Sequence, residues 1–296
     1  MKGKNVFFEK NVVCLHVLFQ NDLLIMRKLP LFIGIILVSC MLCTTSCEQN
    51  KVTCGSCKFE LLPDSVMDVD YNLYSQVKIG NQTWLGENLR CTHYANGAPI
   101  DILDTMVCAR YVFPFGQVDS IQKYGVLYNW AAARGLNDSV VKTDRVQGLC
   151  PQGFHLPTDE EWHDLVYFVS NCSSTKKKTS VAKSLAAHDS CWRISTIPNT
   201  PGFVEDSLVD TNNFSRFAAI PVGNSFENPA TGELRFYNFK SGANFWSSTP
   251  YGYKAGEKTL TNPNAYGRYI GYNDVVANKS VSNKKAYFSI RCIKDK

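Results

Sequence analysis

The sequence is poor in charge and has no heptad or low-complexity segment. Charged residues make up 19% of its 296 residues, which together with the absence of heptads argues against a long coiled coil. Its 19 glycines and 12 prolines are too few for a collagen-like or low-complexity chain. Hydrophobic residues make up 45% and aromatic residues 12%, which is far too apolar for a disordered protein. The composition therefore predicts a globular domain.

A basic surface charge is also lacking once the first 47 residues are set aside. The chain has a formal net charge of +5, but residues 1–47 hold five of its 31 basic and two of its 26 acidic residues. The rest of the chain is nearly neutral, without the concentrated basic charge that is typical of nucleic-acid binders. We therefore expect no nucleic-acid partner.

Motifs that would carry catalysis or hold a metal are missing. The sequence has no Gly-x-Ser-x-Gly elbow, P-loop, dinucleotide fingerprint or zinc-binding helix. Residues 68–72 begin like a calcium-binding EF-hand loop, but Leu73 and Ile79 stand where that loop needs a glycine and a glutamate. We expect a turn there, no metal, no cofactor and no enzyme. A hydrolase or other enzyme whose site is formed by residues distant in the chain is the alternative.

What the sequence does have is an N-terminal export signal. Residues 26–28 form a positively charged start, and residues 29–38 form an apolar segment too short to span a bilayer comfortably. We interpret residues 26–47 as a signal peptide and residues 1–25 as a mis-assigned N-terminal extension. The signal ends in small residues before a cysteine, as in lipoproteins, where that cysteine is acylated.

Two cysteines are candidates for this lipid. Cys40 follows a good lipobox, whereas Cys47 lies where the sequence changes from apolar to polar. Acylation at Cys40 would leave the apolar residues 41–43 exposed on a tether, so we expect the lipid on Cys47. The Thr-Ser-Cys-Glu ending also resembles lipoprotein signals of Bacteroidetes-type bacteria. We predict a protein of the cell envelope, anchored by lipid at the outer membrane or cell surface; an ordinary cleaved signal is the alternative.

The chain has 12 cysteines, and an exported location makes disulfides their natural role. Acylation at Cys47 leaves eight cysteines in the exported part, an even number that fits four disulfides. Cys54 and Cys57 form a C-x-x-C pair, for which we favour a local disulfide over a redox centre or a metal half-site. Cys172 and Cys191 bracket a loop-rich stretch and form a second candidate pair.

Local patterns predict a tether over residues 48–65 and a folded domain over residues 66–296. Residues 76–79 and 82–85 alternate around Gly-Asn, which is a hairpin signal. Residues 124–134 have helical spacing and are followed by a glycine that would end a helix.

The strongest helix signal begins at Thr158. Thr158 and Glu161 have the spacing of a capping box, and three acidic residues fill the first turn. Apolar residues at i, i+3, i+4 and i+7 from Trp162 form one stripe. These carboxylates are therefore explained without catalysis.

The order of these segments resembles a known family, the Fibrobacter succinogenes major paralogous domain, abbreviated FISUMP. Members of this family are mostly uncharacterised and occur in exported, often lipid-anchored bacterial proteins. Five blocks match in the family's order, over about residues 66–294. The matching blocks are residues 77–89, 124–130, 150–162, 245–249 and 288–292.

Residues 156–162 and 290–292 also look like the larger C-type-lectin-like superfamily. This resemblance implies an α+β fold with two short helices, an antiparallel sheet and long loops. It further implies a disulfide between Cys150 and Cys292, worth on the order of 4–5 kcal/mol in the chain-entropy model. Extra cysteines that the family blocks lack, and that we also expect in disulfides, are Cys91, Cys108, Cys172 and Cys191.

A lectin-like fold does not by itself confer lectin activity. The calcium-and-sugar motifs of true C-type lectins are missing, as is a recognisable copper-binding cysteine pair of formylglycine-generating enzymes. We expect a cell-surface binding or adhesion module for a glycan or a surface protein, with a structural subunit of a surface assembly as a further alternative. Sheet packing is the alternative role of the aromatic residues that we propose for ligand binding. These residues are Tyr251, Tyr253, Tyr266, Tyr269 and Tyr272.

Overall fold

The computed structural model divides the chain into two compact units, residues 1–49 and 50–296. All described residues belong to the second unit, so the expected signal peptide with Cys40 and Cys47 lies outside them. Among the described residues, no helix has the length and apolar composition that crossing a membrane requires. The structure describes residues 51–54, 57–100, 111–112, 114, 120–135, 145–172, 179–204, 212–228, 230–252 and 262–296.

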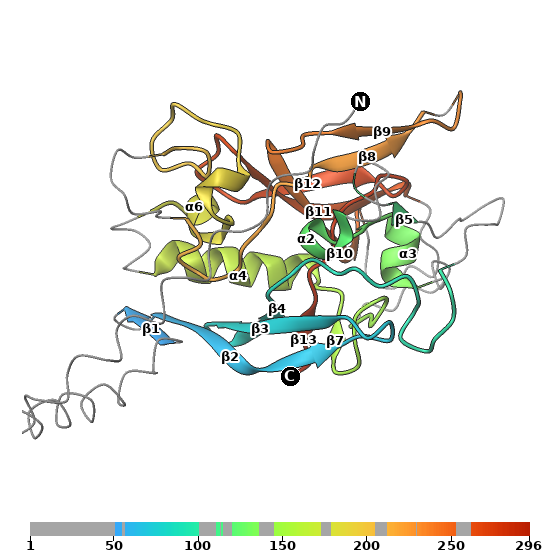
Figure 1. Ribbon diagram of the computed structural model, residues 1–296, viewed down its shortest axis with the longest axis horizontal. Coiled ribbons are helices and arrows are strands. Elements are labelled where there is room, and N and C mark those ends of the chain that lie inside the picture. Colours follow the sequence, from blue (N-terminus) through green and yellow to red (C-terminus); the bar gives the residue numbers. More distant parts are fainter. Residues whose placement is uncertain are drawn as a thin grey trace, which may run out of the picture. The chain divides into compact units, whose positions relative to one another are not determined.

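The second unit is an α+β domain built on antiparallel strand pairs (Figure 1). Its strands are β1 (Lys51–Cys54), β2 (Cys57–Met67), β3 (Leu73–Ile79), β4 (Gln82–Leu85), β5 (Tyr111–Val112), β6 (Leu127–Tyr128), β7 (Phe154–His155), β8 (Asn224–Glu227), β9 (Leu234–Tyr237), β10 (Gly242–Pro250), β11 (Asn264–Gly271), β12 (Asn278–Asn283) and β13 (Ile293–Lys294). Its helices are α2 (Ile121–Tyr124), α3 (Trp130–Arg134), α4 (Asp159–Asn171), α6 (Val181–Leu185) and the 3-10 helix η3 (Asp189–Cys191).

The described strands form two main sheets and two two-stranded sheets, β5-β6 and β8-β9. The larger sheet has the order β1-β2-β3-β4-β13-β7, and the smaller one has the order β10-β11-β12. Helix α4 lies between these two sheets (Figure 1). Its buried Trp162 and Leu165 pack in one hydrophobic cluster with Trp84 of β4 and Phe245 of β10. The apolar stripe of the helix thus joins the two sheets into one core.

The helix start predicted at Thr158 is confirmed. Thr158 Oγ1 accepts a hydrogen bond from the Glu161 N–H at 3.1 Å, and the Glu161 carboxylate accepts one from the Thr158 N–H at 3.0 Å. The predicted hairpin is also confirmed as β3 and β4, with Ile79 opposite Gln82. Gly80 in its turn has φ 61°, a left-handed conformation that glycine adopts without steric cost.

The helix predicted over residues 124–134 is wrong for its first half, which strand β6 interrupts. Tyr128 exchanges two backbone hydrogen bonds with Phe288, at 2.8 and 2.9 Å. This pairing with a distant residue overrides the local helical spacing, because propensity is a weak constraint beside tertiary contacts. The remaining helix, α3, is capped by the Asn129 side chain and ends before Gly135, as predicted.

The tether expected over residues 48–65 is wrong for most of its length. Residues 51–54 form β1 and residues 57–65 lie in β2, which pairs with β3. Phe59 on β2 is fully buried and contacts Phe168 of α4, with ring centroids 5.9 Å apart. The segment therefore belongs to the core rather than to a linker.

The disulfide implied by the family resemblance is present. Cys150 and Cys292 are bonded, with their Cα atoms 5.8 Å apart. Both residues are fully buried in one hydrophobic cluster with Leu156 and Phe288. The bond ties the loop before β7 to the residue before β13.

A second disulfide contradicts two of the expected pairs. Cys57 at the start of β2 is bonded to Cys172 at the end of α4. Cys57 therefore cannot pair with Cys54, and Cys172 cannot pair with Cys191, which is a free thiol. Packing of β2 against α4 brings these two cysteines together across a sequence separation of 115.

A buried arginine links the last part of the chain to two distant loops. Arg291 is fully buried and donates hydrogen bonds to the carbonyl oxygens of Gly86 at 2.9 Å and Phe217 at 2.5 Å. It also donates to the Asn88 side-chain oxygen at 2.9 Å. Burial lowers the pKa of Arg291 to about 10, so the guanidinium stays charged at neutral pH.

Candidate binding site

The late tyrosines do not form a single site. Tyr251 and Tyr266 contact each other, with ring centroids 5.3 Å apart. Tyr269 lies on the opposite face of β11 from Tyr266, because successive side chains of a strand alternate. The Tyr272 ring lies beneath the guanidinium of Arg193, and Tyr253 lies outside the described residues. The predicted residues are thus divided between two places on the domain.

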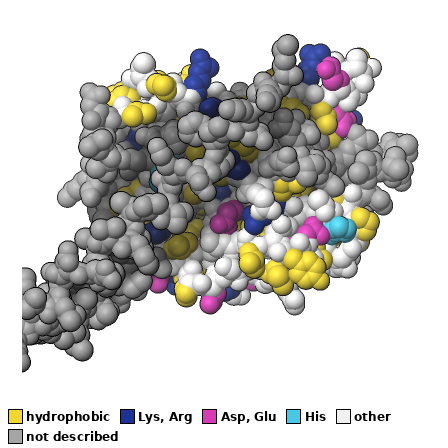
Figure 2. Space-filling view, in the orientation of Figure 1, with side chains coloured by type: hydrophobic (Ala, Val, Ile, Leu, Met, Phe, Trp, Pro, Cys, Tyr) yellow, Lys and Arg dark blue, Asp and Glu magenta, His cyan; other side chains and the backbone are white. Residues whose placement is uncertain are grey.

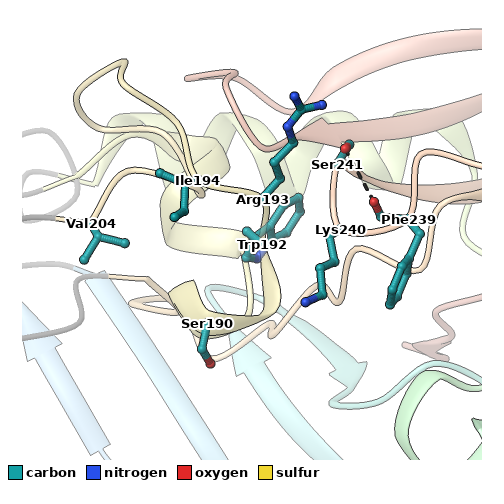
Figure 3. A pocket seen from close by; sticks show the side chains of 8 residues that line it. All are labelled: Ser190, Trp192, Arg193, Ile194, Val204, Phe239, Lys240 and Ser241. Carbon is teal, nitrogen blue, oxygen red and sulfur yellow. Dashed lines mark hydrogen bonds between the residues drawn. The ribbon is translucent and has the colours of Figure 1, made fainter.

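A cavity of about 740 Å³ lies close to Tyr272 (Figure 3). We call it the loop groove, because one wall is the loop that follows η3 and the other is the turn between β9 and β10. Its volume is in the range of small-molecule and peptide-side-chain pockets, about 300–1,000 Å³. It is lined by Ser190, Trp192, Arg193, Ile194, Val204, Phe239, Lys240 and Ser241.

The lining of the loop groove is mixed apolar and basic. In Figure 3, Ile194 and Val204 lie on one side of Trp192, and Phe239 and Lys240 lie on the other. Ile194 is 78% exposed and Val204 is 54% exposed, whereas Trp192 is only 4% exposed. The accessible apolar area is therefore mainly aliphatic, over a buried indole.

Backbone hydrogen bonds hold the walls of the loop groove together. The Arg193 N–H donates to the Lys240 carbonyl oxygen at 2.7 Å, which joins the two walls directly. The Tyr272 N–H donates to the Ser241 carbonyl at 2.9 Å, and the Gly202 N–H donates to the Tyr272 carbonyl at 2.8 Å. A Cβ on residue 202 would lie 2.0 Å from the Arg193 carbonyl oxygen, so this approach requires glycine. The groove is therefore preorganised.

The turn between β9 and β10 contains two residues in the left-handed region. Asn238 has φ 61° and Lys240 has φ 58°. Asparagine adopts this conformation readily, but for a lysine it costs on the order of 1 kcal/mol. The Lys240 N–H donates to the Pro221 carbonyl oxygen at 2.9 Å, which fixes the conformation. Such strained backbone is typical of functional sites.

A second cavity, of about 400 Å³, lies between α4 and the sheet of β11 and β12. We call it the helix–strand cavity. Its charges compensate each other, because Asp159 pairs with Lys279 at 2.5 Å and with Arg268 at 3.1 Å. Lys279 also lies 3.6 Å above the ring of Tyr266, so this cavity adjoins the first tyrosine pair. It is lined by Asp159, Glu160, His163, Val166, Arg268, Ala277 and Lys279.

The residues that imitate an EF-hand loop form a turn, as predicted. The Asp68 carboxylate accepts hydrogen bonds from the N–H groups of Asp70 and Asn72, both at 2.9 Å, and from the Tyr74 hydroxyl at 2.7 Å. These donors occupy the oxygens that a cation would need. Within the described ranges, no group of three or more His, Cys, Asp or Glu residues is arranged to hold a metal ion.

One histidine is buried between two carboxylates. His155 is 2% exposed, with Nδ1 2.6 Å from Asp295 and Nε2 3.0 Å from Glu161. Burial favours the neutral imidazole, but the hydrogen bonds and charges of Glu161 and Asp295 outweigh it and raise the pKa of His155. None of the three residues lines either cavity. The cluster therefore braces β7, the start of α4 and the end of the chain.

Cys91 is a buried free thiol, although we expected it in a disulfide. Burial is the main cause that raises the pKa of this thiol, and the charge of Asp68 adds to it. A thiol held in its neutral form is a poor nucleophile. Cys191 is the other free thiol among the described residues, and Cys108 lies outside them.

None of the residues that line the loop groove was predicted from the sequence. Its walls come from residues 190–204 and 239–241, which are distant in the chain. The first segment does carry one visible signal, since apolar residues stand among proline, asparagine and glycine in an irregular loop. Exposed apolar residues in a loop can mark a contact surface. The second segment has no comparable signal.

These features define a disulfide-braced α+β domain with a preorganised cavity built from loops. The family model of the Fibrobacter succinogenes major domain matches residues 77–294, and the chain belongs to this family. The match runs from β3 to β13 and confirms the resemblance to FISUMP proteins. No curated protein and no solved structure matches the chain.

Proposed function

We propose that this protein is a lipoprotein of the cell envelope, held at the outer membrane or cell surface, that works as a binding or adhesion module for a glycan or a surface protein. The lipid would be on Cys47, with Cys40 as the alternative. The domain would be C-type-lectin-like, which the Cys150–Cys292 disulfide between the loop before β7 and the last strand supports. The membrane would be contacted through the lipid.

The loop groove is the observation that carries this proposal. It combines exposed apolar side chains with a few polar and basic groups, as ligand sites do. Its walls are joined by backbone hydrogen bonds, which lowers the cost of ordering side chains on binding. Of the tyrosines expected at the site, Tyr272 contacts a lining residue of the loop groove, Arg193, whereas Tyr251 and Tyr266 border the helix–strand cavity.

The titratable groups favour binding over catalysis. Asp70 and Glu161 have shifted pKa values, and in both cases hydrogen bonds outweigh burial and lower the pKa. A general acid needs a raised pKa instead. Asp70 Oδ1 also lies 2.6 Å from Nδ1 of the exposed His93, but neither residue lines one of the two cavities. The proposal therefore includes no catalytic residue, metal or cofactor.

The free edge of β2 is poorly suited to assembly through strand pairing. The outer edge of β2 beyond its pairing with β1 carries Pro63, and its register shifts between Leu62 and Val66. Proline and bulges on an edge strand oppose pairing with another chain.

On the face drawn in Figure 2, basic and acidic side chains are interspersed, which agrees with the near-neutral charge and with the absence of a nucleic-acid partner from the proposal.

The ligand site can be tested with two neighbouring isoleucines. The full-length protein, extracted in detergent, is applied to a glycan array and to a panel of envelope proteins. Ile194→Ser should weaken binding severalfold, because Ile194 lines the loop groove. Ile197→Ser changes a residue that is 46% exposed on the same loop but does not line the groove, and should have no effect. A ligand that both variants bind like the wild type would refute the groove as the site.

The lipid can be tested by metabolic labelling with a palmitate analogue in cells that express the full chain. We expect label on the wild type and on Cys40→Ala, and none on Cys47→Ala. Label that is lost only in Cys40→Ala would move the lipid to that residue. An unlabelled wild type would refute the lipid anchor.

A further inference from the structure

The loop groove holds two cations to which the described residues give no acidic partner. The Arg193 guanidinium lies 5.3 Å from the Tyr272 ring, and Lys240 Nζ lies 6.0 Å from the Phe239 ring. Neither cation takes part in an ion pair, and no Asp or Glu is among the described lining residues. In the helix–strand cavity, by contrast, Asp159 compensates both cations. The loop groove therefore favours a ligand with negative charge.

The apolar part of the loop groove favours a polypeptide over a sugar. Its exposed apolar side chains are those of Ile194, Val204 and Phe239, which are 78%, 54% and 38% exposed, so two of the three are aliphatic. Aliphatic side chains offer neither hydrogen bonds nor a flat ring, so they gain most from contact with other apolar side chains. The indole of Trp192 is 4% exposed, and the Tyr272 ring is in contact with Arg193. The Phe239 ring is 38% exposed, but it contacts the Tyr124 ring at a centroid distance of 5.8 Å, and Lys240 Nζ lies 6.0 Å from it. Each aromatic ring is therefore at least partly covered.

The positions of the two cations favour an extended ligand. In Figure 3, the side chains of Arg193 and Lys240 extend away from each other, on opposite sides of Trp192. A linear segment with separated carboxylates can contact both cations in these positions. The hydrogen bond between the two walls and the left-handed backbone of Lys240 fix the positions from which these side chains extend. The points from which the two cations extend are therefore fixed by the fold.

We infer that the loop groove binds an acidic polypeptide segment in extended form. Its carboxylates contact Arg193 and Lys240, and its apolar side chains pack beside them on Ile194 and Val204. This inference rests on the proposed binding function and narrows its ligand to a protein. An acidic oligosaccharide would satisfy the two cations but would leave the aliphatic side chains without apolar partners.

The test exposes the full-length protein in detergent to an array of random dodecapeptides, with polygalacturonate, heparin and dextran as sugar probes. Bound peptides should be enriched in Asp and Glu together with Leu, Ile, Val or Phe, and should bind more weakly at high salt. Arg193→Gln and Lys240→Gln should each weaken the best peptides by about fivefold or more. Arg235→Gln replaces an exposed cation on β9 outside the groove and should leave binding unchanged.

Three results would overturn the inference. The first is a set of bound peptides without acidic enrichment, or no bound peptide at all. The second is unchanged affinity in both glutamine variants. The third is tighter binding of polygalacturonate, heparin or dextran than of any peptide. If that sugar binding is lost in Ile194→Ser, the proposed binding function stands and only its ligand class is wrong. If no peptide and no sugar probe binds, and Ile194→Ser also leaves binding to the glycan array and the envelope-protein panel unchanged, the proposed function itself fails.

Discussion

Replacement of Arg291 should destabilise the folded unit strongly. Arg291→Met keeps a long side chain in a fully buried position but removes the guanidinium. Three acceptors within 2.9 Å then lose their donor, namely the carbonyl oxygens of Gly86 and Phe217 and the side-chain oxygen of Asn88. These groups belong to two loops that are distant in the chain, so the loss separates segments that no disulfide holds together.

The magnitude follows from the cost of unpaired buried groups. Each buried acceptor without a donor costs about 1–3 kcal/mol, so three cost about 3–9 kcal/mol. Removal of the buried charge returns part of its desolvation penalty, which is several kcal/mol. We therefore expect Arg291→Met to lose about 3–5 kcal/mol. For a domain of this size, each kcal/mol lowers Tm by about 2–4 °C, so this loss should lower Tm by roughly 10 °C.

Urea unfolding of the protein, followed by tryptophan fluorescence, measures this loss. Arg235→Met is the matched control, because Arg235 is 56% exposed and pairs at 3.3 Å with an equally exposed glutamate; it should change stability by no more than about 0.5 kcal/mol. Arg291→Lys keeps the charge but changes the geometry, because an ammonium cannot reach acceptors on both sides. The unfolding free energy of this variant should be lower by about 2 kcal/mol or more. A loss below about 1 kcal/mol in Arg291→Met would refute this reasoning.

Three further results follow from the disulfide, the buried histidine and the strained lysine. The pair Cys150→Ala and Cys292→Ala should lose about 4–5 kcal/mol in urea unfolding, because the bond closes a sequence separation of 142; a pair variant as stable as the wild type contradicts this. Burial opposes protonation of His155, but Glu161 outweighs it and raises its pKa, so the stabilising imidazolium is fully present below about pH 6.5 and is lost as pH rises through the raised pKa. The urea midpoint of the wild type should therefore fall more steeply above that pH than the midpoint of His155→Gln, and equal slopes would exclude this role. Lys240→Gly should gain about 0.5 kcal/mol by relief of its left-handed backbone while Lys240→Ala gains nothing, and equal unfolding free energies for these two variants would show that no strain is stored there.

Elements with a local cause could be predicted from the sequence. The start of α4 depends on Thr158 and Glu161, which are three residues apart and bond to each other directly. The β3–β4 hairpin depends on Gly80, whose left-handed conformation fits a two-residue turn. In both cases the residues that cause the structure are neighbours in the chain, so their pattern is visible without a fold.

Elements with a distant cause could not be predicted in the same way. Tyr128 lies in a segment with helical spacing, yet its backbone pairs with Phe288. Cys57 has a cysteine three residues before it, yet it is bonded to Cys172, because Phe59 packs against α4 and carries the start of β2 to the end of that helix. The Cys150–Cys292 pair is equally distant, and only the family resemblance indicated it.

The candidate site also depends on residues that are distant in the chain, so it could not be predicted from the sequence. The tyrosines were selected because aromatic residues often bind ligands, but Tyr266 lies where Lys279 and Asp159 already satisfy each other. Two cations to which the described residues give no acidic partner, Arg193 and Lys240, lie instead in the loop groove, where a backbone hydrogen bond joins their two walls. Residue type alone cannot distinguish a lysine that has an acidic partner from one that does not. The distinction depends on which carboxylates the fold brings near, and in this domain it separates the helix–strand cavity from the loop groove that we propose as the binding site.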